Sequence, residues 1–574
     1  MIGSRTISGH SMPLNTVLVI LNIAGLAVTT MAFHEAFVSM KVLLACIGIG
    51  VVVLTVIGLI LLKGRLMIAT VARVLVGSLF IVSGLIKAND PVGFSYKLEE
   101  YFQDGALAYR IKELFGAPGF SMESFIDSAL AISIAVCVIE IVLGVLLLIG
   151  GKMKWISWFL MVMMLFFTFL TWHTANCDPT KKFTDRDTYE LSDTKQATQA
   201  RIKIDASKTN KDIRIISKNT QEVVVDELKS PQCVADCGCF GDALKGSVGR
   251  SLTPSESLWK DLILLYLVIW IFAAQRIIQP NSVRQNWKIL PLSLVIIAAF
   301  CWVFDWYFPL VFAAVALVSA LWIYRSGGRL LGNHIGSTLI VTFWCSFFVW
   351  YVLKYDPLKD YRPYAVGSNL NARMKSDSPL DLRPFLDAED VTKYELELPA
   401  ISEQLEASTT VGLRLKEITG GATLEIPQIE YNVESYPLEN YQILDTIEVA
   451  NPDFMEVSAL ELILKEKKLL VVVIKRLEEI DPEVIPELLR LQAEAKKAKI
   501  PMILITNAYA EMIKNFRSKY GLTIPTFVND ETELKVISRS STCLLVLKKG
   551  KVVGKYTHNS LPTFDWIVKT HLSK

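Results

Sequence analysis

Long apolar runs recur along the chain as far as Leu353. Each run holds about 16 to 23 mostly apolar residues, close to the roughly 20 that a helix needs to cross a bilayer. We therefore predict about nine transmembrane helices, although the first run is also consistent with a signal peptide that lacks a small-x-small cleavage site. The runs are Leu14 to Phe33, Val42 to Leu62, Ile68 to Ile86, Ala129 to Ile149, Trp155 to Trp172, Leu258 to Ala274, Ile289 to Phe304, Pro309 to Ile323 and Ile335 to Leu353.

The composition agrees with a membrane part joined to a soluble part. Of the 574 residues, 52% are hydrophobic and 20% are charged, which is too apolar for an ordinary soluble protein and too charged for a bundle of spans alone. The net charge of +2, from 59 basic and 57 acidic side chains, excludes a basic footprint for nucleic acid.

Basic residues concentrate in every second connection between the apolar runs. The positive-inside rule places these connections and the N-terminus in the cytoplasm. The alternate connections, including residues 173–257 and everything after Lys354, then face outward. Within the first of them, residues 178–231 carry short alternating patches that favour a strand-rich insert, with disorder as the alternative. The basic residues are Lys63, Arg65, Lys152, Lys154, Arg276, Arg284, Lys288, Arg325 and Arg329.

The outward tail has the order of elements of a thioredoxin-like α/β domain. We expect a linker with some strands at 355–455, followed by strand, helix, strand, helix, a hairpin and a last helix. The strands are Leu469–Ile474, Met502–Thr506 and Cys543–Leu547, the helices are Pro482–Ala498, Ala508–Tyr520 and Leu561–His571, and the hairpin turns at Lys548–Lys551.

Four of the nine cysteines lie in predicted spans, where a thiol usually acts as a small apolar filler. Four others lie in one outward connection, where an oxidising compartment permits disulfides. These are Cys177, Cys233, Cys237 and Cys239, and the last three belong to the stretch CVADCGCFGD.

Three interpretations of the outward cysteines remain open. In the redox interpretation, Cys237 and Cys239 form a short, strained and exchangeable bridge around Gly238. In the metal interpretation all four thiolates bind zinc, although the spacing C-x3-C-x-C departs from the usual paired pattern. In the structural interpretation, Cys177 and Cys233 staple the insert at its base.

Charged residues also occur inside the predicted spans. Arg73 and Glu140 are costly in hydrocarbon unless they are paired, so we predict a buried ion pair between them. This pair serves either a proton or quinone role or only the register of the helices. Lys87 and Asp90 lie at the outer edge of the same region, and His173 precedes Cys177 by one helical turn, so we count them as auxiliary candidates.

Several stretches resemble a known family of membrane proteins. RVLVGSLFIVSGLIKANDPVGFSYKLEEYF, Arg73 to Phe102, and the following span with Glu140 resemble the DoxX-like proteins. DCGCFGDALKGSVGRSLTPSESLWKD, Asp236 to Asp261, is similar to the cysteine loop of the methylamine-utilisation MauE and DoxX group. DPLKDYRPYAVGSNL, Asp356 to Leu370, together with the tail, resembles the longer bacterial members.

The resemblance implies a four-helix core whose spans begin at Ile68, Ala129, Trp155 and Leu258. It also implies a bacterial inner-membrane location and electron transfer from thiols to a quinone, or assistance to disulfide formation in a periplasmic client such as an amine dehydrogenase. No metal is expected. The implied parts are extra N-terminal spans at 1–67, the core at 68–275 with its insert at 178–231 and cysteine loop at 233–242, further spans at 276–354, a linker at 355–455 and the thioredoxin-like domain at 456–574.

The tail lacks the dithiol of a catalytic thioredoxin. After LLVVVI the chain reads KRLEEIDPEV instead of a C-x-x-C motif, and Thr542 stands where a proline usually precedes the next-to-last strand. The leading hypothesis is therefore a thiol:quinone oxidoreductase that uses Cys237 and Cys239 and serves a periplasmic client protein. The alternative is a non-catalytic membrane scaffold whose tail binds a partner, and a transporter is a weaker third hypothesis.

Overall fold

The computed structural model describes residues 64–219, 221–234, 238, 240–244, 251–326, 333–370, 383–384, 409–450 and 466–573. Two compact units make up the chain. The first comprises Met1–Leu353 with Pro357–Lys359, and the second comprises Lys354–Asp356 with Asp360–Lys574. The predicted spans Leu14 to Phe33 and Val42 to Leu62 lie outside the described residues.

Within the described ranges, seven helices are long and apolar enough to cross a membrane, and they coincide with the other seven predicted runs. The chain is therefore a multi-pass membrane protein. The helices are α3 (Arg65–Asn89), α6 (Ala129–Ile149), α7 (Met153–Ala175), α10 (Pro254–Ala274), α11 (Val283–Val303), α12 (Phe308–Ser326) and α13 (Asn333–Tyr355).

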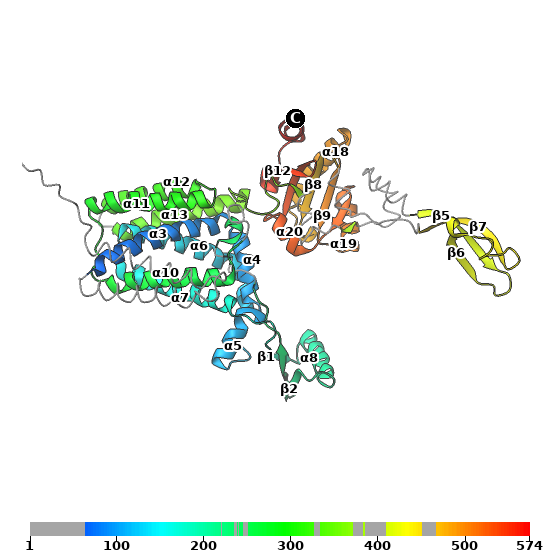
Figure 1. Cartoon of the computed structure of the whole chain (residues 1–574), viewed down its shortest axis with the longest axis horizontal. Coiled ribbons are helices and arrows are strands. Elements are labelled where there is room, and N and C mark those ends of the chain that lie inside the picture. Colours follow the sequence, from blue (N-terminus) through cyan, green and yellow to red (C-terminus); the bar gives the residue numbers. More distant parts are fainter. Residues whose placement is uncertain are drawn as a thin grey trace, which may run out of the picture. The chain divides into compact units, whose positions relative to one another are not determined.

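Four of these helices form the core of the bundle. The pairs α3 with α6, α7 with α10, α10 with α3 and α6 with α7 are all in contact, and these are the helices expected from the sequence. Helices α11 and α12 cover α3 and α6 (Figure 1). Helix α13 joins α12 through the stacked rings of Phe308 and Phe348, whose centroids are 4.9 Å apart, and through a 2.8 Å hydrogen bond from Ser337 Oγ to the Ala320 carbonyl.

Glycines let α3 and α6 approach each other closely. A Cβ atom at Gly144 would lie 2.9 Å from the carbonyl oxygen of Gly77, and one at Gly84 would lie 2.6 Å from Ile141 Cγ1. Neither distance is compatible with a real side chain, so the two backbones touch at these positions. Small residues serve this purpose in membranes, where helix association depends on packing rather than on the hydrophobic effect.

One end of the bundle carries short helices before α6 begins, and we call it the disulfide end. Asp90 starts α4 by accepting a 2.9 Å hydrogen bond from the Gly93 amide, with Pro91 at the first helical position. The elements are α4 (Pro91–Phe102), η1 (Asp104–Ala108), α5 (Tyr109–Phe115) and η2 (Glu123–Ser128).

The insert between α7 and α10 is a three-stranded antiparallel sheet in the order β1-β3-β2, with one helix packed on it. Asp185 is buried and is held by the ammonium groups of Lys112 and Lys229. Burial alone would raise the pKa of Asp185, but the hydrogen bonds from both lysines bring that pKa below its ordinary value. The elements are β1 (Phe183–Glu190), α8 (Thr194–Ser207), β2 (Ile213–Lys218) and β3 (Glu222–Lys229), with η3 (Gly241–Leu244) before α10.

The second unit contains a six-stranded sheet in the order β12-β11-β8-β9-β10-β4. Strands β8, β9 and β10 are parallel, whereas β11 pairs antiparallel with β8 and β12. The expected strand and helix order is present, and β10 and β4 are additional. The elements are β4 (Arg383–Pro384), β8 (Leu469–Ile474), η5 (Leu477–Glu479), η6 (Pro482–Val484), α18 (Ile485–Lys497), β9 (Met502–Thr506), α19 (Ala510–Tyr520), β10 (Thr526–Val528), α20 (Glu531–Ile537), β11 (Thr542–Lys548), β12 (Lys551–Thr557), η7 (His558–Ser560), α21 (Phe564–Ile567) and η8 (Val568–Leu572).

A separate small sheet, in the order β6-β5-β7, lies within the expected linker. Of its hydrophobic side chains, Leu415 and Ile426 are buried, while Val411, Leu424 and Ile443 are at least 40% exposed. The elements are β5 (Thr409–Glu417), β6 (Thr423–Pro427), η4 (Gln428–Glu430) and β7 (Tyr441–Ala450).

A charged cluster fixes the start of the second unit to its sheet. Asp360 accepts hydrogen bonds of 2.7 Å from Arg362 Nε and from Lys555 Nζ in β12. Burial alone would raise the pKa of Asp360, but the two cations lower it to about 2. The clustered charges therefore stabilise the fold only while Asp360 is ionised.

We expect Gly144→Leu to destabilise the bundle by about 1–3 kcal/mol, because a side chain there collides with α3. The apparent Tm of the detergent-solubilised protein measures the effect. Ala135→Leu, on an exposed part of the same helix, is the matched control and should leave Tm nearly unchanged. Equal Tm values for both variants would contradict the close contact between α3 and α6.

We expect Asp360→Asn to destabilise the second unit by about 2 kcal/mol at neutral pH. The folded pKa of Asp360 is lowered from 3.8 to about 2, so its contribution is present above pH 3.8 and is lost as pH falls through about 2. The difference between wild type and variant should therefore vanish over that interval. Pulse proteolysis in denaturant, with thermolysin at neutral pH and pepsin in acid, measures it.

Asp445→Asn is the control for this experiment. Asp445 pairs with Arg414 at 3.1 Å, but its side chain is 51% exposed, so the substitution should change stability little. A constant difference between wild type and Asp360→Asn from neutral pH to pH 2 would show that Asp360 ionisation does not stabilise the fold.

Candidate functional site

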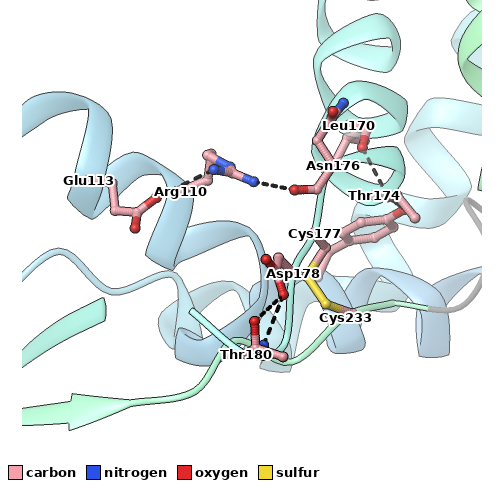
Figure 2. Close-up of a disulfide and its surroundings, with 10 residues drawn as sticks. Arg110, Glu113, Leu170, Thr174, Asn176, Cys177, Asp178, Thr180 and Cys233 are labelled. Carbon is pink, nitrogen blue, oxygen red and sulfur yellow. Dashed lines mark hydrogen bonds and ion pairs between the residues drawn. A yellow bond between two sulfur atoms is a disulfide. The ribbon is translucent and has the colours of Figure 1, made fainter. Parts of the chain in front are cut away.

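A disulfide joins Cys177 and Cys233 at the disulfide end of the bundle, with an S–S distance of 2.01 Å (Figure 2). Cys177 follows α7 directly, and Cys233 follows β3. The bridge therefore ties the two ends of the insert together. Closing a loop of 56 residues is worth about 4 kcal/mol in the chain-entropy model.

Hydrogen bonds fix the chain on the α7 side of this bridge. Arg110 Nη2 donates to the Asn176 carbonyl at 2.8 Å, and Asp178 Oδ1 accepts from the Thr180 amide at 3.0 Å and from its hydroxyl at 2.7 Å (Figure 2). One turn earlier, the Thr174 hydroxyl donates to the Leu170 carbonyl at 3.0 Å. The end of α7 therefore presents Cys177 in a defined position.

The segment after Cys233 returns to the core of the bundle. Val234 is buried in a hydrophobic cluster with Tyr101 of α4 and Leu170 of α7. Gly238 has a left-handed backbone, with φ of +66°, and a Cβ there would lie 3.2 Å from Lys97 Cγ and 3.8 Å from a Phe94 ring carbon. Gly238 therefore rests against α4.

Phe240 supplies a further contact for the cysteine loop. Its ring centroid is 5.3 Å from that of Phe304, at the end of α11, and the ammonium group of Lys260 in α10 lies 5.2 Å from the Phe240 ring. Cys237 and Cys239 lie outside the described residues. Gly238, which separates them in the sequence, lies against α4.

Below this loop, Lys87 and Glu140 form an ion pair inside the bundle. Lys87 Nζ lies 2.6 Å from Glu140 Oε2, and each side chain is 4% exposed. Lys87 also donates to Ser83 Oγ at 3.0 Å, and its ammonium group lies 5.1 Å from the Phe167 ring and 5.8 Å from the Phe94 ring. Phe94 thus contacts both the ion pair and the position of Gly238.

The predicted pair of Arg73 with Glu140 is wrong. Arg73 instead donates to the Leu147 carbonyl from Nε at 3.0 Å and from Nη2 at 2.9 Å, and Nη2 also reaches Asn281 Oδ1 at 3.1 Å. Because α3 and α6 are antiparallel, Arg73 is level with the last turn of α6. Lys87 lies about 21 Å further along α3, toward the disulfide end of the bundle, and its side chain reaches Glu140 there.

The direction of helical side chains identifies the correct partner of Glu140. Each Cα–Cβ bond tilts toward the N-terminus of its helix, so Lys87 and Glu140 lean toward each other from antiparallel helices. The sequence shows both charges, but the partner depends on the register of α3 against α6. The glycine contacts between these helices set that register.

The remaining auxiliary candidates have different surroundings. Asp90 caps α4. His173 is buried, its ring centroid is 5.3 Å from that of Tyr109, and neither ring nitrogen has a hydrogen-bond partner among the described residues. The interpretation of four zinc thiolates is also wrong for this arrangement, because Cys177 and Cys233 are consumed by the disulfide. The four free cysteines of the described ranges, Cys137, Cys301, Cys345 and Cys543, are all buried.

Residues 65–176 match the model of one protein family, described as methylamine utilisation protein MauE. The matched stretch begins with α3 and ends at Asn176, immediately before the disulfide. It therefore covers three of the four core helices but neither the cysteine loop nor the second unit. The comparison with curated proteins and the comparison with solved structures find no match.

We expect Lys87→Met or Glu140→Leu alone to destabilise the bundle by about 3–5 kcal/mol, because either change leaves a buried charge without its partner. The double variant Lys87→Met with Glu140→Leu should recover most of that loss. Denaturant midpoints of the solubilised protein measure the effect. Lys359→Met, which removes a pair with Asp305 whose side chains are 35% and 84% exposed, is the control.

Additive losses in the double variant would contradict a direct Lys87–Glu140 interaction.

Proposed function

We propose that this protein is a thiol-disulfide oxidoreductase of the bacterial inner membrane. Cys237 and Cys239 exchange a disulfide with a periplasmic client, and the four-helix core passes the electrons to a membrane quinone. The contact of Gly238 with Phe94 and Lys97, directly beside the Lys87–Glu140 ion pair, is the observation that carries the proposal. The family match supports a membrane-associated role in methylamine utilisation.

The cysteine loop is anchored to the bundle, which supports disulfide exchange at a fixed position. Cys233 is held covalently, Val234 is buried among core residues and Phe240 packs on Phe304. The two proposed thiols therefore belong to a short segment that is attached on both sides. A short tether keeps a dithiol near its reaction partner and raises its effective concentration there.

We propose that Lys97 supplies a cation to this segment. Its side chain lies against Gly238, and its ammonium group pairs with Glu100 at 2.9 Å. A nearby cation favours the thiolate, which is the nucleophile in disulfide exchange. In the proposed reaction a client thiolate attacks the Cys237–Cys239 bridge, a mixed disulfide forms and then resolves, and both electrons and protons of the client dithiol pass to the C-G-C pair.

We propose that a quinone headgroup binds beside Lys87. The aromatic faces of Phe94 and Phe167 flank an ammonium group that can donate a hydrogen bond to a carbonyl oxygen, and Glu140 can exchange a proton with that ammonium group. A quinone held there would supply an acceptor for two electrons and two protons, so that the C-G-C pair could return to the disulfide. Lys87 and Glu140 would hold and relay a proton within a water-poor region.

A non-catalytic scaffold is the second candidate, and the second unit favours it. KRLEEIDPEV follows β8 without a cysteine, and Cys543 is buried in β11. Burial raises the pKa of Cys543 to about 11, so its thiol stays protonated and unreactive at neutral pH. We propose that the second unit, like a thioredoxin-like domain without its dithiol, binds a partner rather than exchanging disulfides with it.

We expect the redox state of Cys237 and Cys239 to follow the quinone pool. In proteoliposomes, reduction by a dithiol should leave both thiols open to alkylation, and added quinone should close them again, while Cys177 and Cys233 stay bridged throughout. Peptide-resolved alkylation trapping measures this, with the double variant Lys87→Met and Glu140→Leu, which retains most of the stability, as a test of the quinone step and Lys359→Met as its control. If the redox state of Cys237 and Cys239 does not change with dithiol or quinone, the oxidoreductase proposal is wrong.

The scaffold candidate makes the opposite prediction for substitution of both thiols. Cys237→Ser with Cys239→Ser should then leave client maturation in cells unchanged at equal protein level. Loss of maturation would count against a purely binding role.

A further inference from the structure

A group of apolar side chains outside the long helices is exposed at the disulfide end. Leu114 is 56% exposed and Phe115 78%, both in the last turn of α5, while Phe120 and Phe125 in the following segment are 37% and 48% exposed. Large exposed apolar groups clustered in this way mark a surface that contacts another apolar phase.

The opposite face of α5 is fixed to the protein. Tyr109 is buried, with its ring 5.3 Å from both His173 and Phe183, and the ammonium group of Lys112 is ion-paired with the buried carboxylate of Asp185. Ile111 packs against the hydrophobic cluster that contains Tyr101 and Leu170, whereas Leu114 and Phe115, in the last turn, are exposed. The last turn of α5 therefore directs two large apolar side chains away from the protein.

Both ends of this segment adjoin the ends of membrane-spanning helices. The guanidinium group of Arg110 lies 5.3 Å from the ring of Trp172, in the last turn of α7, and donates to the Asn176 carbonyl (Figure 2). The ring of Phe125 is 5.7 Å from that of Phe102, and α6 begins at Ala129. Figure 1 shows α5 at the same end of the bundle as α4.

The exposed apolar side chains of this segment thus belong to a stretch that adjoins the ends of α6 and α7. Tryptophan and arginine at such a position are typical of the membrane–water interface. If this segment lay in water, the apolar side chains of Leu114 and Phe115 would be exposed to solvent although the acyl chains of the bilayer are close enough to cover them.

We propose that α5 and the segment to Phe125 lie in the headgroup layer of the bilayer, with Leu114 and Phe115 inserted among the acyl chains. The occupant of this surface is lipid. Because Arg110 connects α5 to Asn176, the insertion also fixes the depth of Cys177 and of the disulfide relative to the membrane.

Hydroxyl-radical footprinting of the native protein in nanodiscs, with one chain per disc, tests this inference. We expect Phe115 to be protected like Trp158, a span residue that is 52% exposed, and to be oxidised several-fold more slowly than Tyr509, which is 83% exposed in the second unit. Oxidation of Phe115 at the rate of Tyr509 would overturn the proposal. Protection that appears only in discs with two chains would overturn it too, in favour of a contact between copies.

Variants provide a second readout. In Leu114→Asp with Phe115→Asp, the oxidation of Phe120 should rise several-fold, because the segment leaves the bilayer. Ile202→Asp on α8, where the native side chain is 61% exposed, is the matched control and should leave Phe120 protected. An unchanged Phe120 rate in the double variant would mean that lipid insertion of α5 does not cover this segment.

Discussion

The close contact of α3 with α6 determines the geometry of the membrane unit. Gly77, Gly84 and Gly144 remove the side chains that would separate the two backbones, and this sets one register for the pair. In that register Lys87 meets Glu140 near the disulfide end, and Arg73 reaches the last carbonyls of α6 at the other end. A buried ion pair adds little net stability, but it penalises any register that separates the charges.

The same register places the short helices of the disulfide end. Helix α4 begins directly after α3. As a result the Phe94 ring lies close to the ammonium group of Lys87. Lys97, on the same helix, lies against Gly238. The cysteine loop therefore meets α4 at a place that the α3–α6 contact has already set. A site built on such helices is more precise than one built on loops alone, which supports the proposed redox role of this region.

The sequence predicts the large elements well, because apolar length and charge placement are local signals. All seven described spans and the central strands β8, β9 and β11 agree with expectation. Strand β10 has three residues, too few for a period to be read. The partner of Glu140 was mispredicted because charge and burial are visible in a sequence, whereas the register of two helices is not.

Pairing of the cysteines illustrates the same limit. Spacing left open whether Cys177 and Cys233 staple the insert or join a metal site, and the fold brings the two together after 56 residues. The exposed apolar side chains of α5 gave no signal either, because Leu114 and Phe115 are a short apolar pair in a polar stretch. Only the fixed positions of Tyr109 and Lys112 reveal which side of α5 is left uncovered.

The disulfide also has a mechanical consequence. The insert leaves the bundle at Cys177 and returns at Cys233, so the disulfide transmits a pull on β1 or β3 to the end of α7 and to the start of the cysteine loop together. The covalent S–S bond bears the force that would otherwise unfold the last turn of α7. A force on the insert would therefore leave the end of α7 folded.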